Sequence, residues 1–250
     1  MIPKIIHYCW FGGKPLPKSA LKCIASWKKF FPGYEIREWN ESNFDVNAIP
    51  YTKEAYALGK YAFVSDYARF WVIYNCGGIY FDTDVEVIKS MDDILARGPY
   101  MGREAGSFLR NVCEPETNLD GLAVNPGLGM AATAGMDVFK EFLDGYQERH
   151  FLNQDGTMNT KTIVSYTSEI LLKYGLKDDE VPVEVSGIWI YPKDYFCPMD
   201  HTRGCVLNIT ENSRSIHRYD ASWINAGLIG HHIVLAKRYA TRVLLRLKSQ

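Results

Sequence analysis

The 250-residue sequence has no long apolar run, no CxxC pair and no marked excess of charge of either sign. Because no apolar stretch approaches the roughly 20 residues that a membrane-spanning helix needs, we expect no transmembrane segment. The 28 basic and 29 acidic side chains nearly cancel, so the composition gives no overall case for nucleic-acid binding. Internal repeats and low-complexity segments are also missing, and we therefore expect one compact domain.

The six cysteines are scattered, and most of them lie among apolar residues. Without paired spacing they do not indicate a metal cluster, and we expect reduced, buried thiols in a cytoplasmic protein. The sequence opens with MIPKII, which lacks the charged start and long apolar core of a secretion signal. We interpret this opening as the beginning of a first strand.

Acidic residues are missing after Asp220, whereas five basic residues follow it. Residues 233–247 have the spacing of an amphipathic helix with an apolar face and an arginine-rich face. Two interpretations remain open: this helix docks on the core, or it binds an anionic membrane surface, which suits a lipid-linked acceptor. We therefore divide the chain into a domain at 1–232 and a basic helix at 233–250. The second interpretation predicts peripheral association with the inner face of the plasma membrane.

The apolar periodicity alternates between the patterns of strands and helices. Strands are expected at residues 4–10, 34–39, 79–81, 100–103, 122–124 and 183–191, with 85–88 extending the third. Helices are expected at residues 19–31, 52–76, 91–96, 137–148 and 162–174. A pair of glycines, Gly77 and Gly78, should end the long second helix, because glycine accepts the positive φ that a helix end often needs. The alternation is typical of an α/β sheet.

Residues 77–85, with the sequence GGIYFDTDV, are the most informative stretch of the chain. In an extended backbone alternate side chains share a face, so Asp82 and Asp84 should point the same way. Two carboxylates at one strand end suit a divalent cation such as Mn²⁺ or Mg²⁺. Such a cation commonly holds a diphosphate, which predicts a nucleotide-linked substrate. Taken alone, the pair is weak evidence, because a solvated strand end has the same spacing.

The helix before this strand carries Asp66 and Arg69, which lie on one helix face because they are three residues apart. A guanidinium offers phosphate paired donors, so the functional interpretation places these side chains beside the sugar and diphosphate of a donor. The alternative is a local surface ion pair worth less than about 1 kcal/mol.

Three segments in the order IPKIIHYCWFG (2–12), SDYARFWVIYNCGGIYFDTDV (65–85) and SIHRYDASW (215–223) resemble DXD-motif glycosyltransferases of the bacterial capsular and yeast mannosyl type. The resemblance implies an α/β, GT-A-like nucleotide-binding sandwich around a mostly parallel central sheet, with a C-terminal helical extension. It also implies a retaining, metal-dependent hexosyltransferase. The donor would be a UDP- or GDP-linked sugar, and the acceptor a saccharide or lipid-linked molecule in surface polysaccharide synthesis.

The resemblance further implies roles for individual residues. The catalytic group comprises Asp66, Arg69, Asp82 and Asp84. The ligands of Mn²⁺ (or Mg²⁺) are Asp82, Asp84 and His217. The donor contacts are His7, Trp10, Asp66, Arg69, Tyr80, Asp82, Ser222 and Trp223. We also predict Asn125 as a polar group on the acceptor side, although loop 124–130 fits the family only loosely.

Two other classes of protein remain open from the sequence. A haloacid-dehalogenase-like phosphatase also has an apolar strand before Asp-x-Asp-x-Val and uses the first aspartate as a nucleophile. That class has its motif near the start of the fold, whereas two strands and two helices are expected before Asp82. A non-catalytic sugar- or metal-binding module is the second alternative, and it predicts no response to a nucleotide.

Overall fold

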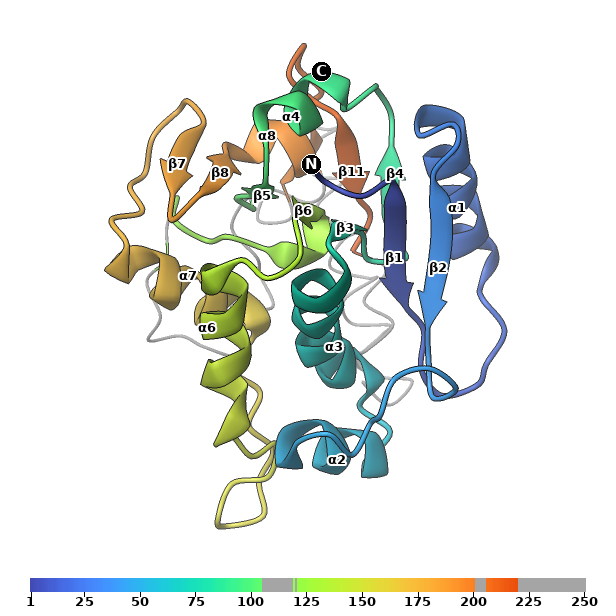
Figure 1. Ribbon diagram of the computed structural model, residues 1–250, viewed down its shortest axis with the longest axis vertical. Helices are drawn as coiled ribbons and strands as arrows, with labels where there is room; N and C mark the ends of the chain where they lie inside the picture. The colour runs from blue at the N-terminus through green and yellow to red at the C-terminus, as the bar shows by residue number, and fades with distance from the viewer. Residues whose placement is uncertain (105–118, 120, 201–205, 220–250) are drawn as a thin grey trace, which may run out of the picture.

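A seven-stranded sheet forms the centre of the protein in this computed structural model, which describes residues 1–104, 119, 121–200 and 206–219 (Figure 1). In spatial order the strands are β2 (Glu35–Trp39), β1 (Ile5–Cys9), β3 (Gly78–Tyr80), β6 (Met130–Ala132), β5 (Tyr100–Gly102), β8 (Ile188–Tyr191) and β7 (Val183–Val185). Only β6 and β7 run antiparallel to their neighbours in this sheet. Most of its strands therefore point the same way, which confirms the expected mostly parallel α/β sheet.

Helices surround this sheet, and two short ladders lie beside it (Figure 1). The helices are α1 (Lys18–Phe30), α2 (Pro50–Ala57), α3 (Tyr61–Cys76), α4 (Asp92–Arg97), α6 (Asp137–Gln147), α7 (Ile163–Lys173) and α8 (Lys193–Phe196), with a 3₁₀ turn, η1 (Pro126–Leu128). The ladders pair β4 (Val85–Val87) with β11 (Ser215–His217), and β9 (Met199–Asp200) with β10 (Val206–Leu207). Helix α3 contacts β1 and β3, and it is the helix that leads directly into β3.

Successive side chains of the central strands enter two different apolar layers. Ile79 and Phe81 lie in one layer together with Trp27 of α1, whereas Tyr80 lies in the other layer with α3, α6 and α7. This alternation is what the pleat of a strand imposes when both faces of a sheet are covered. The described part of the chain is therefore a sandwich of helices around one buried sheet.

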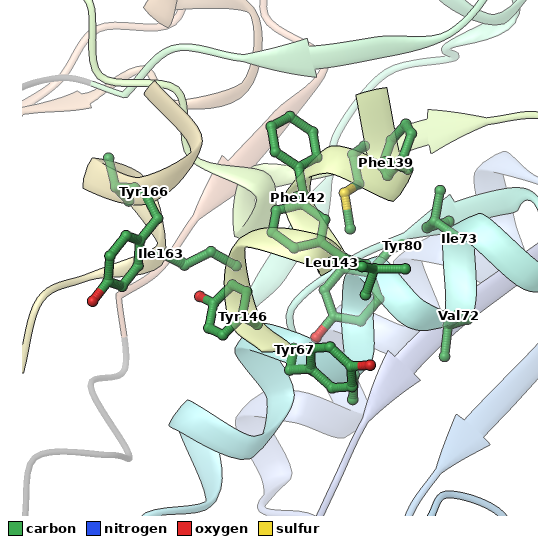
Figure 2. Close-up of a cluster of buried hydrophobic side chains, with 14 of the residues drawn as sticks. Tyr67, Val72, Ile73, Tyr80, Phe139, Phe142, Leu143, Tyr146, Ile163 and Tyr166 are labelled. Atoms are coloured by element: carbon green, nitrogen blue, oxygen red, sulfur yellow. The ribbon is translucent and has the colours of Figure 1, made fainter. Parts of the chain in front are cut away.

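Aromatic packing fixes α3 against α6 and α7. The rings of Phe70 and Phe142 stack with their centroids 4.7 Å apart. Tyr146 meets Tyr67 at 5.9 Å and Tyr166 at 5.7 Å, both edge to face. Figure 2 shows this cluster between the three helices. Because such pairs add to the free energy gained by burial, they hold α3 firmly in place before the strand that follows it.

Residues 52–76, expected as a single helix, form two helices instead. Helix α2 ends at Ala57, and Gly59 has a φ of +66°. The N–H of Lys60 donates a hydrogen bond to the carbonyl of Ala55 at 2.8 Å, and α3 begins at Tyr61. The apolar spacing continues across this break because both helices face the core, so periodicity alone could not reveal it.

Two expected strands also differ from the structure. Residues 183–191 form a hairpin rather than one strand, because Ser186 (φ 51°) and Gly187 (φ 79°) make a two-residue turn between β7 and β8. Positive φ at both central residues is typical of the hairpin turn that matches strand twist. Residues 85–88 do not extend β3: β4 leaves the central sheet and pairs with β11.

The region around β6 was also predicted imperfectly. Residues 122–124, expected as a strand, contribute only an isolated bridge between Val124 and Arg103. The sequence analysis did not identify Met130–Ala132 as β6, although it lies between β3 and β5. A three-residue strand made of one methionine and two alanines has too little pattern to be recognised by periodicity.

Cys9 is a buried thiol, as expected, whereas the Cys76 thiol is only partly buried. None of the helices in the described ranges is both long enough and apolar enough to cross a membrane. The predicted terminal helix and the boundary at residue 232 lie outside the described residues, so they stay predictions.

His7 of β1 is completely buried and uses both ring nitrogens inside the protein. The Trp39 indole N–H, which can only donate, points at His7 Nδ1 at 3.0 Å. Nδ1 is therefore the acceptor, and Nε2–H donates to the Gly77 carbonyl at 2.9 Å. Protonation of Nδ1 would remove the acceptor of the indole N–H and place two donor hydrogens against each other. In agreement, burial lowers the pKa of His7 from 6.5 to about 4.

We expect acid to destabilise the protein through His7. The unfolded chain takes up a proton on this side chain near pH 6.5, whereas the folded protein resists protonation until about pH 4. The contribution of neutral His7 to the free energy of unfolding is therefore fully present above pH 6.5. It falls by about 3 kcal/mol as the pH decreases to 4. His7→Asn keeps an acceptor for Trp39 but does not titrate, so its stability should fall less. Urea unfolding of both proteins between pH 4 and 7.5 measures the difference, and parallel curves would contradict the prediction.

Candidate metal and donor site

Asp82 and Asp84 follow β3 at the carboxyl edge of the parallel strands. Two backbone hydrogen bonds hold the segment: Phe81 N–H donates to the His7 carbonyl at 3.1 Å, and Asp82 N–H donates to the Gly127 carbonyl at 3.2 Å. The chain then turns, because Val85 N–H donates to the Asp82 carbonyl at 3.0 Å. From the sequence, both aspartates were expected on an extended strand. The structure brings them together through a turn instead.

His217 joins the two aspartates from a distant part of the sequence. It pairs with Val85 in the antiparallel ladder of β11 and β4, and the next residue, Arg218, donates its N–H to the Asp84 carbonyl at 2.9 Å. The His217 Nε2 atom lies 3.0 Å from Asp84 Oδ1 and 3.9 Å from Asp82 Oδ2. One ligand atom from each of the three side chains lies within 4.8 Å of the other two. The structure thus assembles the three predicted metal ligands in one place.

Arg69 connects the preceding helix to this cluster. Its side chain is only 5% exposed, and its Nε donates to the Ser65 carbonyl at 3.1 Å. One guanidinium nitrogen lies 3.0 Å from Asp66 Oδ1 and 3.3 Å from Asp82 Oδ1, and the other donates to Asp82 Oδ2 at 3.4 Å. The predicted pair of Asp66 and Arg69 is therefore a buried ion pair that includes Asp82, rather than a local surface pair.

Asp66 sits in an environment that disfavours its charge. Burial raises the pKa of Asp66 to about 7, although the adjacent Arg69 guanidinium acts in the opposite direction. The positive charge of Arg69, in contrast, is stabilised by the carboxylates, and its pKa is raised further although burial alone would lower it. A carboxyl group poised near neutral pH can accept or donate a hydrogen bond, which suits contact with sugar hydroxyls.

Tyr80 and Gly127 fix the carboxylate of Asp82. The Tyr80 hydroxyl donates to Asp82 Oδ1 at 3.0 Å, and the Arg69 guanidinium lies 5.2 Å from the centre of the Tyr80 ring. On the other side, a Cβ added to Gly127 would lie 2.0 Å from Asp82 Oδ2. Any side chain at position 127 would therefore displace the carboxylate.

Part of the chain that contains these site residues matches a known protein family. Residues 17–100 match the family described as the glycosyltransferase sugar-binding region containing a DXD motif. This segment includes Asp66, Arg69 and the motif from Asp82 to Asp84. Residues 17–100 are therefore similar to a glycosyltransferase sugar-binding region. The resemblance stated from the sequence is thereby confirmed for this part of the chain.

Two curated proteins are similar to part of this chain. Inositol phosphoceramide mannosyltransferase 3 of Schizosaccharomyces pombe is 28% identical over 114 residues, which are 44% of this chain and 32% of that protein. An uncharacterized glycosyltransferase of Acanthamoeba polyphaga mimivirus is 34% identical over 104 residues, which are 39% of this chain and 41% of that protein. The matched segments thus span about a third to two fifths of these relatives.

A solved glycosyltransferase has a similar fold. The PaToxG glycosyltransferase superposes with a TM-score of 0.50 at 18% identity, and the match covers 69% of each chain. At this identity the likeness concerns the fold alone. It confirms the GT-A-like α/β architecture expected from the sequence, apart from the C-terminal helical extension, which lies outside the described residues.

The remaining predicted donor and acceptor residues have different surroundings. Trp10 lies partly buried just beyond β1, where its indole N–H donates to the Lys14 carbonyl at 2.6 Å. This places it at the same edge of the sheet as Asp82, and its role as a base contact stays a prediction. His7, in contrast, lies in the core with both nitrogens bonded, so the structure does not bring it to the site as a donor contact. Ser222 and Trp223 lie outside the described residues.

Asn125 is buried rather than exposed toward an acceptor. Its amide nitrogen donates to Glu104 Oε2 at 2.8 Å, and its Oδ1 accepts from the Gly127 N–H at 2.7 Å. Both ends of the side chain are thus engaged at the start of η1. This placement makes Asn125 part of the scaffold beneath Asp82, and its predicted acceptor role stays a prediction.

Glu104, Tyr219 and Gly127 were missed as site residues. Glu104 is an acidic residue two positions after β5, which is a usable signal in an α/β sheet, because strand ends line the ligand edge. Tyr219 lies within the third quoted segment, and its ring meets the His217 ring edge to face at a centroid distance of 4.0 Å. Gly127 gave no signal beyond its turn-rich surroundings, since its role arises from a contact with Asp82.

The cluster of Asp82, Asp84 and His217 has the donor set of a divalent-cation site. Two carboxylates and an imidazole suit Mn²⁺, and the two oxygen ligands also suit Mg²⁺. Burial opposes a charge on His217, but the Asp84 carboxylate, with Asp82 and Glu104, reverses this effect and raises its pKa. The site is therefore anionic enough to attract a positive charge at this position, and a bound cation would displace the histidine proton. The residues present fit a divalent cation.

Gly127→Ala should disturb the cation site through sterics alone. The Gly127 φ lies in the range open to other residues, so alanine is strained by its methyl group against Asp82 and not by its backbone. We expect Mn²⁺ affinity to fall at least about 10-fold, and stability to fall by about 1–3 kcal/mol. Isothermal titration and urea unfolding measure the two effects.

Gly145→Ala is the matched control for Gly127→Ala. Residue 145 lies inside α6, and its added Cβ would meet only the flexible end of Arg149 at 3.3 Å. Alanine favours a helix interior by up to about 1 kcal/mol, so this variant should bind Mn²⁺ normally and be equally or more stable. Equal Mn²⁺ binding by both variants would show that position 127 does not control the carboxylate.

Proposed function

We propose that the protein is a retaining, metal-dependent glycosyltransferase that moves a hexose from a UDP- or GDP-linked donor. The observation that supports this most is the convergence of Asp82, Asp84 and His217 beside the buried Arg69, within and next to a glycosyltransferase sugar-binding region. Mn²⁺ or Mg²⁺ would be held by the two aspartates and the histidine. When bound, this cation supplies positive charge against the developing charge of a diphosphate leaving group.

The side chains around the cation site have complementary tasks in this proposal. Arg69 presents a rigid guanidinium, fixed by Ser65, Asp66 and Asp82, so it needs no reorganisation to stabilise negative charge. Asp66 faces the same space with a carboxyl group poised near neutral pH and would orient sugar hydroxyls. Trp10 at the same sheet edge offers an aromatic surface for the nucleotide base.

A panel of nucleotide sugars tests the proposed donor class. The full chain is incubated with UDP- and GDP-linked hexoses in the presence and absence of Mn²⁺, and release of UDP or GDP is measured. We expect turnover of at least one donor only with the cation, and NMR of the product should show a retained anomeric configuration. An absence of turnover and of nucleotide binding with every donor would contradict the proposal.

For the acceptor, we propose a saccharide or lipid-linked molecule in surface polysaccharide synthesis. The fission-yeast relative is named for a mannosyl transfer to inositol phosphoceramide, which supports the choice of a lipid-linked acceptor. The basic residues after Asp220 support peripheral membrane association of a cytoplasmic enzyme. If deletion of residues 233–250 leaves sedimentation with phosphatidylglycerol vesicles unchanged, the proposed membrane contact is wrong.

Specific contacts weigh against the two other classes of protein. A phosphatase would need Asp82 as a nucleophile, but its two carboxylate oxygens face the Arg69 guanidinium and the Tyr80 hydroxyl. That class also needs a second acidic pair, for which Asp178 and Asp179 are candidates, but Asp178 is bound to Arg103 at 2.5 Å. A binding module without catalysis should ignore the nucleotide, so titration of UDP with Mn²⁺ separates it from a transferase.

A further inference from the structure

Glu104 is a buried carboxylate between the two halves of the candidate cation site. Glu104 is 5% exposed. Its backbone N–H donates to the Ala123 carbonyl at 2.8 Å, and this bond fixes the backbone of Glu104 just after β5. Glu104 Oε2 accepts hydrogen bonds from Asn125 Nδ2 at 2.8 Å and from the Tyr219 hydroxyl at 3.1 Å. One oxygen therefore joins residues that are about ninety positions apart in the sequence.

The first branch from Glu104 leads to Asp82. Asn125, held by Glu104, accepts the Gly127 N–H at 2.7 Å through Oδ1. The Gly127 carbonyl in turn accepts the Asp82 N–H at 3.2 Å, and the Gly127 Cα packs against the Asp82 carboxylate. The position of Asp82 thus depends on the loop that Glu104 and Asn125 hold in place.

The second branch leads to His217. A metal-bound histidine normally has its ring fixed by a hydrogen bond at the second nitrogen, but the buried Nδ1 of His217 has no such partner among the described residues. The Tyr219 ring packs edge to face on the imidazole instead, at a centroid distance of 4.0 Å. Tyr219 has a φ of +51°, which is rare for a bulky residue and needs support from its surroundings. Its hydroxyl bond to Glu104 is one such support.

We propose that Glu104 is a positioning residue that holds Asp82 and His217 in the arrangement that a divalent cation requires. This inference rests on the proposed cation site of the transferase, and it extends that site to a residue that does not touch the cation. Asp82 lies in the turn between β3 and β4, whereas His217 lies on β11, and the Glu104 oxygen is a shared anchor for the contacts behind both.

Mn²⁺ titration of the full chain tests the role of Glu104. Glu104→Leu removes the acceptor, and we expect the Kd for Mn²⁺ to rise about 10- to 100-fold, the usual loss when a partner of a metal ligand is removed. Glu104→Gln keeps a carbonyl oxygen that can accept both bonds, so its Kd should stay within about 3-fold of wild type. Pulsed EPR of bound Mn²⁺ should show the imidazole-nitrogen signal in wild type and Glu104→Gln, and a weakened signal in Glu104→Leu.

Two further variants separate positioning from folding. Tyr219→Phe keeps the ring on His217 but loses the hydroxyl, and it should raise the Kd about 3- to 10-fold even if Glu104→Leu does not fold. Glu141→Leu is the matched control, because it removes the acceptor of another tyrosine hydroxyl, Tyr174, on the surface of α6 and α7. It should bind Mn²⁺ as wild type does.

The outcomes distinguish this inference from the proposed function. Normal Mn²⁺ binding and EPR signals in Glu104→Leu and Tyr219→Phe would overturn the positioning role while leaving the cation site intact. A Glu104→Gln variant as weak as Glu104→Leu would also overturn it, because charge rather than the acceptor geometry would then matter. Failure of the wild-type protein to bind Mn²⁺ would contradict the proposed cation site and, with it, this inference.

Discussion

Asp84→Ala is expected to reduce turnover of the sugar donor by at least about 1,000-fold, which corresponds to about 4 kcal/mol of transition-state stabilisation. Asp84 lies 3.0 Å from His217 Nε2 and provides a carboxylate to the three-residue cation site. Without it, one hard oxygen ligand and one negative charge are lost, and the cation that we propose to stabilise the leaving group would be held poorly. Steady-state release of the nucleotide and Mn²⁺ titration measure the two losses.

The fold should tolerate the Asp84 substitution, because this side chain lies at the site and is partly exposed. Asp144→Ala is the matched control: Asp144 is 57% exposed and forms a surface ion pair with Lys140 on α6. This variant should keep wild-type turnover and wild-type affinity for Mn²⁺. Wild-type turnover by Asp84→Ala, with its fold verified by circular dichroism, would refute the proposed metal-dependent transfer.

Arg69→Met is expected to lower the free energy of unfolding by about 3–5 kcal/mol. The Arg69 side chain is 5% exposed and lies between the carboxylates of Asp66 and Asp82, at 3.0 Å and 3.3 Å. Removal of the guanidinium leaves these carboxylates without their buried counter-charge, and the free energy of the folded state rises. Urea unfolding at pH 7.5 measures the change. Donor turnover should also fall, because the positive group beside the cation site is lost.

Two comparisons make the Arg69 prediction specific. Arg69→Lys keeps the charge but not the forked donors, so its loss of stability should be smaller than that of methionine. Arg37→Met removes an exposed ion pair, in which Arg37 lies 2.8 Å from Glu35, and it should cost less than about 1 kcal/mol. Equal stability losses in Arg69→Met and Arg37→Met would show that the buried position of Arg69 does not matter.

Local sequence patterns predicted much of the framework correctly. The strands β1, β2 and β3 and the helices α1, α6 and α7 lie within one or two residues of their expected bounds. Apolar spacing and turn residues specify such elements because they depend on neighbours only a few positions away. The pairing of Asp66 with Arg69 was equally local, since it follows from three-residue spacing on a helix.

Predictions failed where a distant contact decides the conformation. Gly59 breaks an apolar pattern that continues on both sides of it, and β6 is recognised only by its place between β3 and β5. Asp82 and Asp84 do share a site, but by a turn after β3 and not by the pleat of a strand. The prediction that both aspartates face one site was therefore correct, but the physical reason for it was different.

The sequence by itself determined the α/β class, the helix before the DXD pair and the identity of the candidate cation ligands. Only the tertiary structure decided how these ligands meet, because His217 reaches Asp84 through the pairing of β11 with β4, about 130 residues apart. It also decided that the Arg69 guanidinium is buried between two carboxylates and that His7 lies in the core. Packing likewise places Glu104 in contact with the residues that support the site. Burial and long-range pairing arise from the packing of many segments at once, so no local pattern records them.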